Sequence, residues 1–200
     1  SVAQDVETSL LLLAQDGKIN LSDCTVGVIG VGNVGRRVVE RLESMGCRVV
    51  LNAPPRAELE IEFAKHAVSL SQLQDECDVI TIHTPLITKG THPTLHLVDA
   101  DFLKGLKRRP VLINAGRGEV VDSAALCAAL DQDVVSAVVI DTWENEPHIH
   151  RDLLQKAYLG TPHIAGYSAD GKANGTRMAL QAVAQHFRKN VTFEVIPPAY

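Results

Sequence analysis

The stretch TVGVIGVGNVG, Thr25–Gly35, decides the fold because an apolar, β-branched run leads directly into three spaced glycines. The spacing G-x-G-x-x-G joins the first strand of a dinucleotide-binding unit to its first helix. Gly30 permits the tight turn, Gly32 lets the backbone approach a pyrophosphate, and Gly35 lets helix and strand pack closely. A tight turn without a ligand is the weaker alternative, because both a strand and a helix flank the glycines. The cofactor contacts predicted for this loop are Gly30, Gly32, Asn33, Val34 and Gly35.

The rest of the chain alternates short apolar runs with helical patterns. Most runs are continuously apolar, as expected of strands that are covered on both faces. We therefore predict an α/β fold, a Rossmann-type doubly wound parallel sheet in a single domain with flanking helices. The predicted strands are 25–30, 47–51, 78–83, 110–115, 134–141 and, more weakly, 157–163; the predicted inner helices are 33–46, 69–76 and 122–132. Amphipathic helices over 1–16 and 177–190 are expected to cover the sheet.

The composition is that of an ordinary globular protein, with 46% hydrophobic and 22% charged residues. A formal net charge of −5 without basic stripes argues against nucleic acid or an anionic membrane as a partner. The four cysteines stand far apart without a C-x-x-C pair, which predicts free thiols in a reducing cytoplasm and no metal site. The longest apolar run, from Leu10, is far too short to span a bilayer.

The end of the second predicted strand, LNAPPR, bears on the choice of cofactor. The dinucleotide fingerprint expects Asp or Glu on the ribose hydroxyls about 20 residues after the glycines. That position holds Ala53. Asn52 could hydrogen-bond a ribose and Arg56 could neutralise a 2′-phosphate, so the residues themselves leave NAD and NADP open. The acidic residues over 58–62 are interpreted as solvated surface charge.

Side chains suited to acid–base chemistry follow three different strands. Arg117 follows the fourth strand, in INAGRGEVVD, and its planar guanidinium suits a carboxylate. The fifth is followed by the carboxylates Asp141, Glu144 and Glu146, in DTWENEP, and the last by His163, in GTPHIAGYS. Ligands bind at the carboxyl ends of parallel strands, so we expect an arginine, a carboxylate and a histidine to lie close together there. Taken singly, an arginine or histidine is more often a surface or packed residue, and the seven other histidines are interpreted in that way.

Together these motifs resemble the D-2-hydroxyacid dehydrogenases from about Thr25 to Thr176. The resemblance is carried, in order, by VGVIGVGNVGRRV, HTPL, TLHLVD, LINAGRGEVVD, DTWENEP and GTPHIAGYSADGKANGT. It implies NAD as the cofactor, with Arg117 on the substrate carboxylate, His163 as the acid–base and Glu146 orienting His163. The further contacts that it implies are Thr84, Pro85, Ala115, Gly116, Asp141 and Gly166 to the cofactor, with Ala53 at the ribose, and Tyr167 beside Arg117 to the substrate.

The resemblance also implies parts that lie outside this chain. The family builds a substrate domain mainly ahead of the first Rossmann strand, and only some two dozen residues precede that strand here. We expect an interdomain-type helix and linker over 1–20, a dinucleotide-binding Rossmann domain over 21–176, and a C-terminal helix and tail over 177–200. The family's substrate and dimerisation domains are then missing from the chain.

The partners implied are a small phosphorylated 2-hydroxy acid and, in the full-length protein, a second copy in a homodimer. One alternative is a dehydrogenase for another D-2-hydroxy acid, such as phosphoglycerate or glycerate. The other is a dinucleotide-sensing binding module without turnover.

Overall fold

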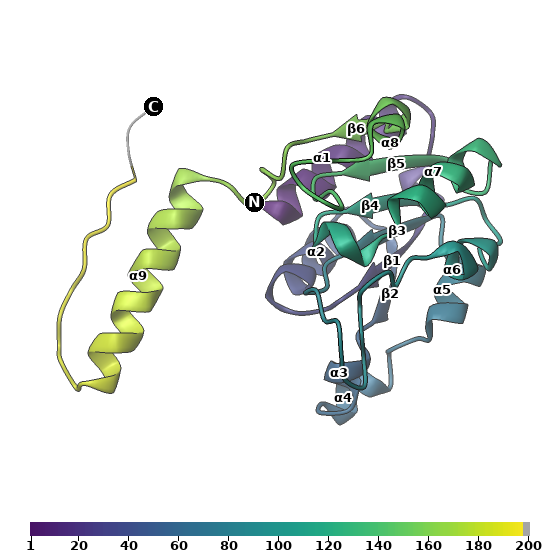
Figure 1. Cartoon of the computed structure of the whole chain (residues 1–200). Coiled ribbons are helices and arrows are strands. Elements are labelled where there is room, and N and C mark those ends of the chain that lie inside the picture. The colour runs from purple at the N-terminus through teal and green to yellow at the C-terminus, as the bar shows by residue number, and fades with distance from the viewer. Residues whose placement is uncertain (198–200) are drawn as a thin grey trace.

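A parallel sheet with helices on both faces forms the body of the protein, whose computed structural model describes residues 1–197 (Figure 1). The six strands run in the order β2-β1-β3-β4-β5-β6, and every neighbouring pair is parallel. Their bounds are β1 (Thr25–Ile29), β2 (Arg48–Asn52), β3 (Val79–Ile82), β4 (Val111–Asn114), β5 (Ala137–Ile140) and β6 (Leu159–Gly160). The predicted Rossmann-type sheet is thus confirmed. The strand order reverses between β1 and β3, which is where such sheets bind ligands.

Two layers of helices cover the sheet. The N-terminal helix α1 and α2 pack on one face, and α5, α6, α7 and α8 pack on the other. The helices are α1 (Val2–Gln15), α2 (Asn33–Ser44), α3 (Pro54–Ala57), α4 (Ile61–Ala64), α5 (Leu70–Glu76), α6 (Ala100–Lys104), α7 (Ser123–Asp131), α8 (Arg151–Lys156) and α9 (Ala169–His186), with single 3₁₀ turns at Leu21–Asp23 and Gly118–Val120.

The continuous apolar runs follow from this layering. Successive side chains of a strand point to opposite faces. In β4, Val111 and Ile113 join the core under α1 and α2, whereas Leu112 joins the core under the other helices. A strand covered on both faces therefore favours apolar residues at successive positions, as in Val111–Ile113, and the whole of β4 is buried.

The inner helices were predicted close to their observed positions. α5 and α7 begin after Ser69 and Asp122, whose side chains accept hydrogen bonds from the backbone N–H groups of Gln72 and Ala125. The short helices α3, α4, α6 and α8 were missed, since four to six residues are too few for a helical period to show in the sequence. α9 begins earlier than expected, and the predicted boundary at 176–177 falls inside it.

The last helix does not cover the sheet, so this prediction was wrong. α9 stands apart from the body of the protein in Figure 1. Its buried residues are only Ala173 and Ala184. Its large apolar residues Met178 and Val183 are exposed, and so is Phe187 directly after the helix. An amphipathic pattern shows that a helix has an apolar face, but it does not say what covers that face.

The four cysteines, Cys24, Cys47, Cys77 and Cys127, are free and buried. In the part of the chain that the structure describes, no helix is long and apolar enough to cross a membrane. No group of three or more His, Cys, Asp or Glu side chains within residues 1–197 could hold a metal ion.

Candidate functional site

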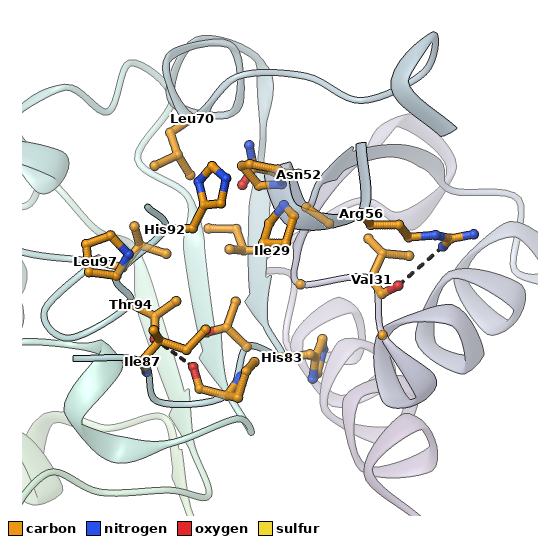
Figure 2. A pocket seen from close by; sticks show the side chains of 18 of the residues that line it. Ile29, Val31, Asn52, Arg56, Leu70, His83, Ile87, His92, Thr94 and Leu97 are labelled. Carbon is orange, nitrogen blue, oxygen red and sulfur yellow. Dashed lines mark hydrogen bonds between the residues drawn. The ribbon is translucent and has the colours of Figure 1, made fainter. Parts of the chain in front are cut away.

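Two cavities open at the carboxyl edge of the sheet, on either side of the glycine loop. The first, of about 590 Å³, lies toward the end of β2 and is drawn in Figure 2. The second, of about 730 Å³, lies toward the ends of β4 and β5. Both are lined by Gly32, His83, Thr84 and Pro85, so they meet at these residues. Together they form one long site that crosses the switch point of the sheet.

The glycine loop has the geometry that a bound pyrophosphate requires. Gly30 has φ +89°, and a Cβ there would lie 2.8 Å from the backbone of His83 and Thr84. A Cβ on Gly35 would lie 2.1 Å from the carbonyl oxygen of Gly30, so helix and strand touch at this point. Around Gly32, by contrast, an added Cβ would meet nothing within 4 Å. The loop therefore packs tightly against the protein at Gly30 and Gly35 and leaves space for a ligand beside Gly32.

The N-terminus of α2 faces this opening. Its N-cap is Gly32, which offers no side-chain cap, so the first N–H groups of the helix are not satisfied by a capping side chain. Asn33 and Val34 in the first turn line the second cavity. Unpaired N–H groups and the positive end of a helix dipole form a site for an anion such as a pyrophosphate.

Two polar atoms at the junction of the cavities have no hydrogen-bond partner among the described residues. They are His83 Nδ1 and Thr84 Oγ1. The other ring nitrogen of His83 lies 2.9 Å from Thr81 Oγ1, and burial lowers the pKa of His83 to about 4. The imidazole is therefore neutral near pH 7. Buried polar groups normally have partners, so these two atoms fit a ligand that supplies hydrogen bonds here, as a dinucleotide would.

The first cavity has mostly apolar walls (Figure 2). Ala53 is buried at the end of β2 and lines it. Asn52 lines it too, but the residue is only 4% exposed and its amide nitrogen donates to Val68 O at 2.7 Å. The fold thus already uses the donor that the sequence analysis offered to a ribose. Arg56 lines the same cavity, as expected of a group that could meet a 2′-phosphate.

The acidic residues over 58–62 are exposed, as the interpretation as solvated charge expects. Glu60 also lines the first cavity, which the sequence did not indicate. Glu58 Oε1 lies 2.7 Å from Nε2 of His92, which also lines it. The short helices α3 and α4 turn this acidic segment back over the end of β2. The sequence pattern, in which acidic and apolar residues alternate over 58–62, does not indicate which way the segment turns.

His163, in the wall of the second cavity, is paired with Glu146, which lies behind it and does not line that cavity. The distance from His163 Nδ1 to Glu146 Oε2 is 2.9 Å, and Glu146 Oε1 accepts the backbone N–H of Trp143 at 2.7 Å. An ionised carboxylate can only accept, so Nδ1 carries the proton of the neutral ring and Nε2 keeps its lone pair. His163 lines the cavity. The pair has the arrangement of a base held in one tautomer by a carboxylate.

Asp141 fixes the loop that carries His163. The backbone of His163 is left-handed, with φ 55°, and its N–H donates to Asp141 O at 2.8 Å. The buried carboxylate of Asp141 accepts from Thr161 Oγ1 at 2.7 Å, Ile164 N at 2.7 Å and Ala165 N at 3.1 Å. Asp141 also lines the cavity. The resemblance implies a cofactor contact for this residue, and the structure adds a positioning role beside it.

Arg117 stands exposed at the rim of the second cavity. Its Nη1 donates to Gly116 O at 2.7 Å, and its guanidinium has no carboxylate partner within the described residues. Asn114 Nδ2 donates to the carbonyl of Arg117 at 3.1 Å. A Cβ on Gly118 would lie 1.9 Å from Trp143 O, so the turn after Arg117 requires glycine. A cation held in this way is available to an anionic ligand.

Glu144, another acidic residue of DTWENEP, stabilises the fold. Its Oε2 accepts the N–H of Ser123 at 3.0 Å, and its Oε1 lies 2.5 Å from His96 Nε2. Burial alone would raise the pKa of Glu144, but the hydrogen bonds from Ser123 and His96 outweigh it and lower that pKa. The carboxylate is thus engaged with the start of α7 and with His96.

The remaining predicted contacts lie around the second cavity. Pro85 lines both cavities. Ala115, Gly116, Gly166 and Tyr167 line the second. Sequence analysis missed His83, Asn114 and Glu60. The first two could have been found as polar residues at the carboxyl end of a strand, the position that marks ligand-binding edges.

A family profile described as "D-isomer specific 2-hydroxyacid dehydrogenase, NAD binding domain" matches residues 12–165. The chain belongs to this family. Among curated relatives, it is 47% identical to erythronate-4-phosphate dehydrogenase of Bacteroides thetaiotaomicron, over 100% of this chain and 57% of that protein. It is 50% identical to the protein of the same name from Edwardsiella ictaluri, over 91% of this chain and 48% of that protein. The chain thus spans about half the length of these relatives.

The fold has a close counterpart among solved structures. D-lactate dehydrogenase with NAD⁺ from Lactobacillus jensenii superposes with a TM-score of 0.74 at 23% identity, over 98% of this chain and 68% of that one. This likeness supports the Rossmann-type architecture at a level where sequence identity alone says little.

Proposed function

We propose that this protein takes part in the NAD-dependent oxidation of the C2 hydroxyl of 4-phosphoerythronate to the 2-oxo acid, a reaction of pyridoxal phosphate biosynthesis. The chain forms the cofactor-binding part of the enzyme. The observation that carries the proposal is His163, which is paired with Glu146 and lines a cavity that extends to the glycine loop. The names of the relatives at 47% and 50% identity support the choice of substrate.

In this proposal the residues of the second cavity act on the substrate. Nε2 of His163 accepts the proton of the C2 hydroxyl, and Glu146 stabilises the imidazolium as it forms. Arg117 binds the substrate carboxylate through its planar guanidinium, and Tyr167 contacts the rest of the substrate. Nicotinamide, when bound, supplies the hydride acceptor.

The cofactor lies along the joined cavities in the same proposal. Gly30, Gly32, Asn33, Val34 and Gly35 hold the pyrophosphate, and Ala53 lies at the adenine ribose. The nicotinamide end meets the neutral ring of His83 as well as the residues that the family resemblance implies. These are Thr84, Pro85, Ala115, Gly116, Asp141 and Gly166.

We also propose the division of the chain into an interdomain-type helix and linker over 1–20, a dinucleotide-binding domain over 21–176 and a C-terminal helix and tail over 177–200. The full-length protein is proposed to be a cytoplasmic homodimer. The four buried free cysteines support a reducing compartment. Sedimentation of the full-length protein tests the dimer.

Two measurements test the function separately. NADH formation by full-length protein is followed with 4-phosphoerythronate, 3-phosphoglycerate, glycerate and lactate as substrates. We expect the highest kcat/KM for 4-phosphoerythronate; preference for another acid would reassign the substrate within the family. Calorimetric titration with NADH tests the cofactor site. Tight NADH binding without turnover of any 2-hydroxy acid would instead favour a dinucleotide-sensing module.

A further inference from the structure

We infer that Glu60 sets the preference for NAD over NADP, because its carboxylate occupies two arginines with which the 2′-phosphate of NADP would pair. This inference rests on the proposed function, since it concerns the ribose end of the same cofactor cavity. In the usual fingerprint, an acidic residue at the position of Ala53 hydrogen-bonds the ribose hydroxyls. The inference assigns part of that role to Glu60.

Glu60 holds the edge of Arg56 that a phosphate would use. Arg56 Nε lies 2.9 Å and Arg56 Nη2 lies 2.8 Å from the same oxygen, Glu60 Oε2. Nε and Nη2 form the edge at which a guanidinium binds carboxylate or phosphate with two parallel hydrogen bonds. A 2′-phosphate approaching Arg56 on this edge must first displace Glu60.

The guanidinium of Arg56 is also fixed from two other sides. Its Nη1 donates to Val31 O in the glycine loop at 3.3 Å, the bond drawn as a dashed line in Figure 2. Its Cζ lies 4.3 Å from the centre of the Phe63 ring, and Phe63 is buried. We therefore expect Arg56 to stay in place when Glu60 is substituted, with Nε and Nη2 free to bind a ligand in the cavity.

Arg36 completes the cluster. Its Nη2 lies 3.4 Å from the second carboxylate oxygen, Glu60 Oε1. Arg36, Arg56 and Glu60 line the cavity together with Ala53. Glu60 thus binds both of the arginines that line this end of the cavity. Without Glu60, this end would have the charge and the free donors that suit a phosphate.

The same carboxylate suits the unphosphorylated ribose. Ala53 has no acceptor for the ribose hydroxyls, whereas a carboxylate on the cavity wall has two oxygens that can accept from them. The hydrogen bond from Arg56 lowers the pKa of Glu60, so the acceptor is ionised at neutral pH. A 2′-phosphate in its place meets like charge, which is how one cofactor is excluded as another is bound.

The charge of Glu60 is tested with Glu60→Gln, which keeps the size of the side chain and one acceptor oxygen but removes the charge. Dissociation constants are measured for NADH and NADPH, and for 5′-AMP and 2′,5′-ADP, which probe the ribose end without the nicotinamide. We expect NADPH and 2′,5′-ADP to bind about tenfold more tightly to Glu60→Gln than to the unsubstituted protein. NADH and 5′-AMP should change by no more than about threefold. The matched control is Glu62→Gln, two residues away, whose carboxylate pairs with Lys65 and does not line the cavity.

A second substitution identifies the group that receives the phosphate. Arg56→Ala in the Glu60→Gln background should abolish the gain for NADPH. An unchanged ratio of NADPH to NADH affinity in Glu60→Gln, with NADH still bound, overturns the inference and leaves the proposed function standing. If the unsubstituted protein binds neither dinucleotide, the proposed function fails and the inference fails with it.

Discussion

The two halves of the cavity differ in what lines them. The half beside β2 has mostly apolar walls, and residues of the segment 52–60 line much of it. The half beside β4 and β5 holds Arg117 and His163, each supplied by the turn after a different strand. In the function proposed above, cofactor choice depends on that segment and reactivity on residues far from it in the sequence. The predictions below for His163, Glu146 and Ala53 use that separation.

The largest effect is expected from His163→Ala, on the reactive side. Removal of the base should lower kcat at least ~100-fold, the scale of general-base catalysis. The dissociation constant for NADH should change little, because the affinity side is untouched. Steady-state kinetics and calorimetry on the full-length protein measure both. His66→Ala, an exposed histidine outside the cavities, is the control. Near-normal kcat in His163→Ala would remove this residue from the mechanism.

His83 lies where the two halves meet, and its effect is on stability. Burial lowers its pKa from 6.5 to about 4, so the folded state resists a proton that the unfolded state accepts below pH 6.5. Stability from this group is complete above pH 6.5 and is lost as the pH falls toward 4, by up to about 3 kcal/mol.

Urea unfolding at several pH values should show this loss. In His83→Gln, which does not titrate, the decline between pH 6.5 and 4 should be shallower by about the same ~3 kcal/mol. Parallel curves for the two proteins would mean that His83 is not held neutral by burial.

Glu146→Gln should have a smaller effect on the reactive side. The amide oxygen can still accept from Nδ1 of His163, so the ring keeps its tautomer and loses only the neighbouring charge. We expect kcat to fall by about tenfold, below the ~100-fold scale of the base itself. Cofactor affinity should again stay constant. A fall as large as that of His163→Ala would show that Glu146 does more than orient and stabilise the imidazole.

The smallest effect is expected from Ala53→Asp, on the affinity side. A second carboxylate at the ribose should accept from its hydroxyls and repel a 2′-phosphate, so the preference for NADH over NADPH should rise about fivefold. kcat with saturating NAD should not change. Binding titrations with the two reduced cofactors provide the measurement. Tighter NADPH binding instead would mean that residue 53 does not face the ribose.

Much of this site was predictable because its strands and turns follow residue patterns that can be recognised in the sequence itself. Strands buried on both faces must be continuously apolar, and the glycines of the first turn must leave room for the backbone of β3. Once β4, β5 and β6 are placed in one parallel sheet, the turns that carry Arg117, Glu146 and His163 must meet at one edge. The roles of these residues remain predictions, since geometry brings the side chains together without showing the reaction.

What sequence reasoning missed depends on contacts that no local rule determines. The pairing of Glu60 with Arg36 joins residues 24 positions apart, and the direction of α3 and α4 decides it. The apolar face of α9 suited a covering helix, but its place depends on the path of the chain between β6 and Ala169. That His83 Nδ1 is buried without a hydrogen-bond partner can be recognised only once the packing around it is known.

The two cavities meet at Gly32, His83, Thr84 and Pro85, so a dinucleotide bound across them places one nucleotide in each. Once one nucleotide is seated, the pyrophosphate tether presents the other at an effective concentration in the millimolar range or above. Each half alone can therefore bind weakly while the joined molecule binds well. A substitution at the ribose end therefore changes the occupancy of the nicotinamide half of the cavity, although the ribose end touches no reacting atom.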